Sequence, residues 1–144
     1  MMNDVNKVLV DFELKDTMGK VHNLLSYAGM KVYIKFWASW CSICLAGLEE
    51  VDSLASKDND FIVLSIVAPG FKGEMSLEGF KEWFNTLSRN NLTVLLDEEG
   101  RFTNKLEVRG YPTSAFIGSD GFLVNIVQGQ KSNEEIQRIF KTIN

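Results

Sequence analysis

The sequence is poor in the residue types that build metal sites and disulfide frameworks. Its 144 residues include two cysteines, one histidine and two prolines. Two cysteines are too few for a disulfide scaffold, and a chain of this size does not require one. A structural zinc site needs about four ligands, and besides the cysteines only His22 and carboxylates could supply them, which disfavours a metal. His22 is expected at the surface or in a local hydrogen bond.

Long apolar runs and an excess of positive charge are also missing. No run approaches the ~18 residues of a membrane span, and the net charge is −4. The absence of a basic patch with interleaved aromatic residues argues against a nucleic-acid partner. Residues 1–11 are too short and mixed for a signal peptide. The start, Met1-Met2-Asn3-Asp4, resembles that of a trimmed chain, so it says little about a natural precursor.

The remaining composition is that of a globular protein with a substantial core. Hydrophobic residues make up 45% and charged residues 24% of the chain, which are ordinary values for folded domains. No repeat, low-complexity segment or linker interrupts the sequence. The length fits one domain, and we expect residues 1–144 to form it.

Strand-like and helix-like segments alternate along the chain. Residues 8–25 predict a hairpin-like N-terminal extension, because two strand-like runs flank a turn signal at 16–19. The expected strands are 32–37, 61–67, 93–96, 114–117 and 122–127. The expected helices are 42–57, one capped by Ser76, a short one carrying Phe102 and Leu106, and one that starts with a Ser132/Glu135 capping box. This order indicates an α/β fold with a mixed sheet.

The two cysteines, Cys41 and Cys44, are separated by two residues at a strand-to-helix junction. Cys41 is expected at the exposed start of helix 42–57, where unpaired N–H groups and the helix dipole favour a thiolate. The apolar stripe of that helix consists of Cys44, Leu48, Val51 and Ala55. A thiolate with a second thiol one turn away can attack a disulfide and then be released. The spacing indicates a redox dithiol, with half a zinc site or two inert thiols as the alternatives.

A resemblance to the thioredoxin superfamily is carried by F-W-A-S-W-C-S-I-C at 36–44, V-R-G-Y-P-T at 108–113 and a Gly-Ser-Asp-Gly hairpin at 118–121. The lead-in D-F-E-L-K-D-T-M-G-K-V and the extra segment 68–90 are similar to the TlpA/ResA-like branch. Members of that branch are extracytoplasmic thiol–disulfide proteins, often exported and membrane-anchored. The resemblance covers residues 8–143. It implies a thioredoxin-like fold with a central mixed sheet flanked by helices, an N-terminal extension and a central insertion.

The resemblance also implies roles for individual residues. Cys41 would be the attacking thiol and Cys44 the resolving thiol. Pro112 would be a cis-proline facing the dithiol, and its neighbours would lie beside the sulfurs. The positions expected to line the site are therefore Trp40, Tyr111, Pro112 and Thr113.

Two features depart from the pattern of ordinary thioredoxins. Ser42 and Ile43 separate the cysteines, with no proline, so the reduction potential of thioredoxin cannot be assumed. Lys35 stands six residues before Cys41, where cytoplasmic thioredoxins carry a buried acid. A lysine pointing under the dithiol would lower the cysteine pKa values and assist proton transfer. A lysine whose stem reaches the surface would have no chemical role, and we expect this second arrangement.

The segment V-A-P-G-F-K-G-E, followed by F-K-E-W-F, is similar to thioredoxin-like donors that reduce methionine sulfoxide reductases. The resemblance implies a protein-disulfide reductase that uses no cofactor and is returned to its reduced form by an upstream thiol electron donor. It implies a location in the bacterial periplasm or at the cell surface, with any membrane attachment through a segment outside this sequence. The alternatives are a thiol reductase of cytochrome c maturation, a disulfide-forming oxidant, or a binding module with a vestigial or regulatory dithiol.

Overall fold

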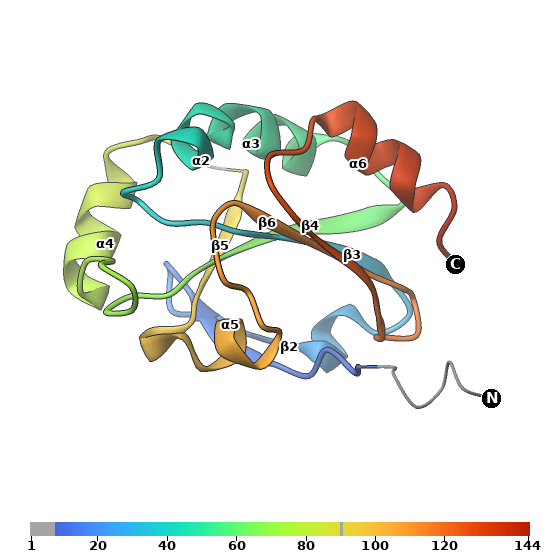
Figure 1. Ribbon diagram of the computed structural model, residues 1–144, viewed down its shortest axis with the longest axis horizontal. Helices are drawn as coiled ribbons and strands as arrows, with labels where there is room; N and C mark the ends of the chain where they lie inside the picture. Colours follow the sequence, from blue (N-terminus) through green and yellow to red (C-terminus); the bar gives the residue numbers. More distant parts are fainter. Residues whose placement is uncertain (1–7, 90) are drawn as a thin grey trace.

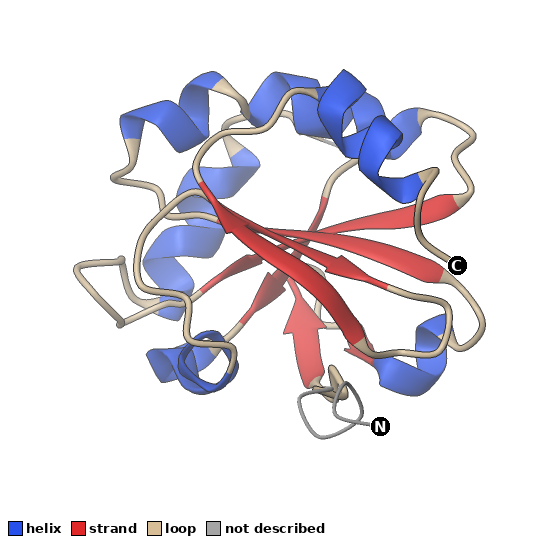
Figure 2. Ribbon diagram, turned by 45° about the vertical axis from the view of Figure 1, so that its right-hand side comes forward, coloured by secondary structure: helices blue, strands red, loops and turns tan. Residues whose placement is uncertain are grey.

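A seven-stranded mixed sheet crosses the molecule, with helices on both of its faces (Figures 1 and 2). The structure is a computed structural model that describes residues 8–89 and 91–144. In chain order the strands are β1 (Glu13–Asp16), β2 (Val21–Asn23), β3 (Lys31–Phe36), β4 (Phe61–Val67), β5 (Thr93–Leu96), β6 (Thr113–Ile117) and β7 (Leu123–Gln128). The five predicted strands that correspond to β3 to β7 are confirmed to within one residue, whereas β1 begins five residues into the predicted extension 8–25.

The strands lie side by side in the order β2-β1-β5-β4-β3-β6-β7. β4 pairs in parallel with β3 and β5, whereas β6 pairs antiparallel with β3 and β7. β1 pairs antiparallel with β2, which confirms the predicted hairpin, and with β5, so the hairpin extends the sheet by two strands. β3 and β4 are almost entirely buried, which explains why their sequences are near-continuous apolar runs.

The helical segments are η1 (Leu24–Tyr27), α2 (Ser42–Ala46), α3 (Leu48–Ser56), α4 (Leu77–Asn85), η2 (Glu98–Gly100), α5 (Arg101–Lys105) and α6 (Asn133–Phe140). Two predicted helix starts are confirmed. The Ser76 side chain accepts a hydrogen bond from the Gly79 N–H, and Ser132 and Glu135 form a reciprocal capping box. Among the described residues, no helix combines the length and the apolar character needed to cross a membrane.

The prediction of one continuous helix over 42–57 is wrong. The helix divides at Gly47, which has φ −92° and ψ 0°, into α2 and α3. A Cβ at this position would lie 2.3 Å from the Gln130 side chain, so only glycine allows that side chain to pack so closely. The division also changes the buried stripe, because Leu54 is fully buried whereas Ala55 is half-buried.

Two apolar clusters, one on each face of the sheet, hold these elements in place. The first lies under α2, α3, α4 and α6 and contains Cys44, Trp37 and Phe80. The second lies on the face covered by α5 and the N-terminal extension and contains Phe36 and Phe102. Each fully buried side chain of this kind contributes about 1.5–3 kcal/mol to folding. The strand that leads to the cysteines is therefore anchored on both faces.

Candidate active site

The sheet topology brings the C-x-x-C motif and the Tyr111-Pro112-Thr113 segment together at the ends of β3 and β6. β3 ends at Phe36, shortly before Cys41, and β6 begins at Thr113, immediately after Pro112. Because β3 and β6 are antiparallel neighbours and Phe36 pairs with Thr113, the segment leaving β3 and the segment entering β6 meet. Residues about 70 positions apart in sequence thus face each other.

Cys41 and Cys44 form a disulfide across the first turn of α2, with their Cα atoms 5.2 Å apart. Cys41 is the N-cap residue of α2, and its sulfur accepts a hydrogen bond from the Cys44 N–H at 3.3 Å. Cys44 is fully buried, as predicted. Cys41 is only 8% exposed, less than expected for a helix start, because the segment before β6 packs against it.

The segment before β6 contributes the other wall of the site. The Tyr111–Pro112 peptide bond is cis, as predicted, and the Tyr111 carbonyl oxygen lies 3.8 Å from the Cys41 sulfur. The Thr113 hydroxyl donates to the Gly110 carbonyl oxygen at 2.7 Å and so closes the turn. Burial raises the pKa of the Tyr111 phenol, and the negative charges of Glu74 and Asp97 raise it further.

Two exposed apolar side chains frame Cys41. Trp40 is 54% exposed and Ile43 is 59% exposed, although both are large and apolar. The Trp40 ring lies edge-on to the Tyr111 ring, with centroids 5.8 Å apart. Exposed apolar groups around a recessed reactive atom form a surface on which another protein can dock. Ile43 was not predicted as a site residue, since sequence alone cannot show which residue of a C-x-x-C turn faces outward.

The expectation that the Lys35 stem reaches the surface is wrong. Lys35 is 2% exposed, and its ammonium donates a hydrogen bond to the Cys44 carbonyl oxygen at 3.4 Å. Burial lowers the pKa of Lys35 from 10.5 to about 8, although the negative charge of Glu50 opposes this change. The Lys35 ammonium therefore lies against the Cys44 backbone, and its pKa of about 8 lets its charge change slightly above neutral pH.

Sequence reasoning missed the contribution of the loop between β4 and α4. The Glu74 carboxylate in this loop accepts hydrogen bonds from both the backbone N–H and the hydroxyl of Ser39, two residues before Cys41. Lys72 donates to the Arg109 carbonyl oxygen at 3.2 Å, two residues before Tyr111. No local pattern signals these contacts, because each joins residues more than 30 positions apart.

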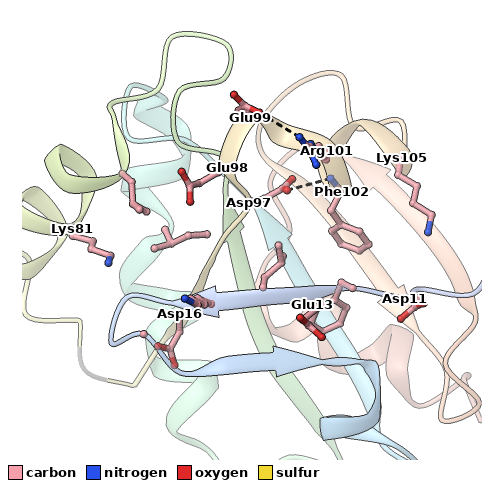
Figure 3. A pocket seen from close by; sticks show the side chains of 16 residues that line it. Asp11, Glu13, Asp16, Lys81, Asp97, Glu98, Glu99, Arg101, Phe102 and Lys105 are labelled. Atoms are coloured by element: carbon pink, nitrogen blue, oxygen red, sulfur yellow. Dashed lines mark hydrogen bonds and ion pairs between the residues drawn. The ribbon is translucent and has the colours of Figure 1, made fainter.

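The part of the chain that the structure describes holds no group of three or more His, Cys, Asp or Glu side chains placed to bind a metal ion. A cavity of about 730 Å³ does exist, bounded by β1, the end of β5, the start of α4 and the η2–α5 segment (Figure 3). Neither cysteine lines it. Its buried acid, Asp97, already accepts hydrogen bonds from the N–H groups of Phe102 and Thr103 in the first turn of α5. The cavity is therefore separate from the redox site.

Comparison with known proteins agrees with this geometry. The family model named Redoxin matches residues 4–142. The chain belongs to the Redoxin family. It is 46% identical to the pneumococcal exposed lipoprotein thioredoxin (Etrx1) of Streptococcus pneumoniae strain TIGR4. That crystal structure superposes with a TM-score of 0.89, over 92% of this chain and 99% of the other.

Two further similarities extend the assignment. The N-terminal domain of PilB from Neisseria gonorrhoeae is 27% identical, with a TM-score of 0.84, over 90% of this chain and 87% of that one. The thiol-disulfide oxidoreductase ResA of Geobacillus kaustophilus is 26% identical over 96% of this chain and 78% of its own. This Redoxin-family protein has a thioredoxin-like fold and is a thiol–disulfide oxidoreductase with Cys41 and Cys44 as its C-x-x-C pair. The predicted superfamily, branch and activity are confirmed.

Proposed function

We propose that the protein reduces disulfides of partner proteins, with Cys41 as the attacking thiol and Cys44 as the resolving thiol. The difference in access between the two sulfurs supports this assignment. Cys44 is fully buried, whereas Cys41 lies at the surface edge between the exposed side chains of Trp40 and Ile43. A partner sulfur can approach Cys41 without unfolding α2, but it cannot reach Cys44.

The proposed reaction is a pair of thiol–disulfide exchanges. The Cys41 thiolate attacks one sulfur of the partner disulfide, the other partner sulfur leaves as a thiolate, and a mixed disulfide forms. The Cys44 thiolate then attacks the Cys41 sulfur and releases the second partner thiolate. Two electrons pass to the partner, which gains two thiols, and the protein is left with the Cys41–Cys44 disulfide. An upstream dithiol must reduce that bond before the next cycle.

Backbone donors favour the first step. The Cys44 N–H already points at the Cys41 sulfur at 3.3 Å. A donor in this position stabilises a thiolate more than a thiol and so lowers the pKa of Cys41. The thiolate is the species that attacks a disulfide, so this hydrogen bond increases the reactive fraction near neutral pH.

Lys35 favours the second step. Cys44 must lose its proton in a buried environment before it can attack, and burial disfavours the thiolate. The Lys35 amine lies at the Cys44 carbonyl and has a pKa of about 8. In its neutral form it can accept the Cys44 proton, and the resulting ammonium then stabilises the thiolate. We infer that Lys35 is the proton acceptor for resolution.

We propose a methionine sulfoxide reductase as the partner. The segment 67–74 and the helix that follows it resemble the corresponding part of thioredoxin-like donors for such reductases, and this resemblance supports the choice. A reductase of that kind ends its cycle with a disulfide that must be reduced from outside. The exposed apolar side chains beside Cys41 are suited to contact with a protein rather than with a small solute.

We further propose an extracytoplasmic location and a single functional domain covering 1–144. The similarity to a pneumococcal protein named as an exposed lipoprotein thioredoxin supports the location. One continuous sheet joins the N-terminal hairpin to the strands that carry the redox site, which supports a single domain.

Trapping with Cys44→Ser tests the function. This variant lacks the resolving thiol, so the mixed disulfide through Cys41 should persist. In extracts of the source cell, we expect it to enrich a methionine sulfoxide reductase, released by dithiothreitol. Cys41→Ser is the matched control and should trap nothing, since its remaining thiol is buried. Apocytochromes or a broad set of folding substrates would instead favour the other functions of the branch.

The reduction potential of the Cys41/Cys44 pair tests the direction of electron flow. A value near about −270 mV is expected for a reductant, whereas about −120 mV indicates an oxidant. If the dithiol reduces no disulfide and Cys44→Ser captures no protein, the proposal is contradicted and a binding module is favoured.

A further inference from the structure

The Glu74 carboxylate is buried beside the redox site and is fully committed to hydrogen bonds. Glu74 is 8% exposed and lies in the loop between β4 and α4. Its oxygens accept from the Ser39 N–H at 2.8 Å, from the Ser39 hydroxyl and from the Met75 N–H at 2.9 Å. Within the described part of the chain, no lysine or arginine forms an ion pair with it. Backbone and hydroxyl donors are therefore what compensate the burial of this carboxylate.

The residue that Glu74 holds is part of the turn that presents Cys41. The Cys41 N–H donates to the Ala38 carbonyl oxygen at 3.2 Å, which closes a tight turn over Ala38, Ser39 and Trp40. Ser39 lies in the middle of this turn and is held by Glu74 through both its backbone and its side chain. The orientation of Trp40 and Cys41 is therefore coupled to the position of Glu74.

The same loop also contacts the opposite wall of the site. Lys72 donates to the Arg109 carbonyl oxygen at 3.2 Å, just before Tyr111 and Pro112. Gly73 faces Trp40 closely enough that a Cβ would lie 3.8 Å from the indole nitrogen. The loop thus contacts both segments that surround the Cys41 sulfur. A charged hydrogen-bond acceptor makes the strongest of these contacts.

We propose that Glu74 is a positioning residue of the redox site, which fixes the Ser39-Trp40 turn so that Cys41 meets a partner disulfide in the orientation needed for attack. This inference rests on the proposed role of Cys41 as the attacking thiol. Glu74 does not touch the reacting sulfurs and acts through Ser39. Its contribution is to orientation, since exchange requires the attacking sulfur to approach along the axis of the partner's sulfur–sulfur bond.

The test is a set of four purified variants: Glu74→Gln, Ser39→Ala, the double variant and Glu78→Gln. Glu78 is exposed on α4, so its change to glutamine removes the same charge without removing these hydrogen bonds. Each reduced protein is mixed with the chromogenic disulfide DTNB in a stopped-flow instrument. The pH is set above the pKa of Cys41, so that the rate reports presentation of the thiolate rather than its ionisation.

We expect Glu74→Gln to lower the second-order rate constant at least about tenfold. Ser39→Ala should lower it by less, because the Ser39 N–H still reaches the carboxylate. The double variant should be no slower than Glu74→Gln alone, because coupled residues give non-additive effects. Glu78→Gln should match the wild type. The melting temperature of each oxidised variant separates a loss of presentation from a loss of folding.

Wild-type rates in Glu74→Gln, or additive effects in the double variant, would overturn the inference. If Glu74→Gln does not fold, Ser39→Ala decides alone: a lowered rate with an unchanged melting temperature supports the inference, and an unchanged rate overturns it. DTNB needs no protein partner, so the result is independent of which disulfide the protein reduces in the cell. A wild-type dithiol inert toward DTNB would instead contradict the proposed function.

Discussion

The N-terminal hairpin and the redox site each bury one polar side chain, His22 and Lys35, and hold it in different ways. In the hairpin, the buried His22 ring contacts the Asp16 carboxylate through Nε2 at 2.8 Å and the Tyr27 hydroxyl through Nδ1. At the redox site, the buried Lys35 ammonium donates a hydrogen bond to the Cys44 carbonyl oxygen. The apolar side chains of Trp40 and Ile43 remain exposed nearby. Both regions expose apolar side chains, but His22 is paired with side chains no more than six positions away, whereas Lys35 is held by a backbone carbonyl nine positions away.

This contrast separates groups that serve folding from groups that serve chemistry. A buried amine lowers the stability of a lone domain, and it is not needed to close the sheet. The position of Lys35 at the Cys44 backbone fits the role in exchange that we propose for it. The hairpin pairs β1 with β2 at one edge of the sheet, and β5 and β4 separate it from β3. Substitutions at the redox site should therefore change the rate of disulfide exchange, whereas substitutions in the hairpin should change only the stability of the fold.

The largest expected effect lies within the redox end itself. In the reduced protein near neutral pH, iodoacetamide should label Cys41 on the order of 100-fold faster than Cys44, because only Cys41 is accessible and its thiolate accepts a backbone hydrogen bond. Mass spectrometry of peptides at timed quenches measures both rates. In denaturant the two rates should converge, which provides the control. Equal labelling of the folded protein would remove the proposed division of roles.

Lys35→Met should make the protein more stable and a poorer reductant. The folded pKa of about 8 lies below the usual 10.5, so the buried ammonium destabilises the fold at every pH below 8. At about 1.4 kcal/mol per pH unit this cost is about 3 kcal/mol, and it is relieved as the pH rises from about 8 to about 10.5. Methionine should remove both the cost and this pH dependence. Resolution at pH 7 should slow at least about tenfold.

Urea titrations of the oxidised protein from pH 6 to pH 10.5 measure the stability change, and single-turnover release of a reduced partner measures resolution. Lys31→Met is the matched control on the same strand, since the Lys31 ammonium bonds the Phe140 carbonyl oxygen and lies near Asp60, away from the cysteines. That variant should not gain stability and should resolve normally. If Lys35→Met resolved at the wild-type rate, Lys35 would have no part in proton transfer.

The smallest effect should follow from changes in the hairpin. His22→Ala leaves Asp16 and Tyr27 without their shared partner and should lower the free energy of unfolding by about 1–3 kcal/mol. Tyr27→Phe removes one of the two contacts and should cost less. Both variants should exchange with DTNB at the wild-type rate. A hairpin variant that slowed exchange would contradict the separation of the two regions.

The elements of the sheet could be predicted because their signals are local. Apolar runs placed β3 and β4, the Ser76 and Ser132 caps placed two helix starts, and the C-x-x-C spacing placed the dithiol at a strand-to-helix junction. The cis bond before Pro112 followed from the family resemblance. In each case a pattern of a few neighbouring residues determines the structure, so one sequence was sufficient.

The parts that could not be predicted depend on distant contacts. Gly47 ends α2 where Gln130 packs against it, and no residue near Gly47 signals that contact. The burial of Lys35 depends on α2 covering β3, and a lysine in a strand has no intrinsic preference that reveals it. Glu74 reaches Ser39 across 35 positions. The strands and helices that carry the site could therefore be predicted from the sequence, whereas the contacts of Lys35 and Glu74 with the segment around the cysteines could not.

The pairing of β3 with β6 has a consequence for which substitutions the protein can tolerate. Phe36 pairs with Thr113 in this ladder, and that register places Tyr111 near Cys41. A slip of one residue would shift the loop by about 3.3 Å and turn every β6 side chain to the opposite face. Exchange should therefore be as sensitive to bulges and prolines introduced into these two strands as to changes beside the sulfurs. Beyond the two cysteines, a mutational scan scored by disulfide reduction should find intolerant positions along β3 and β6, strands that contain no cysteine.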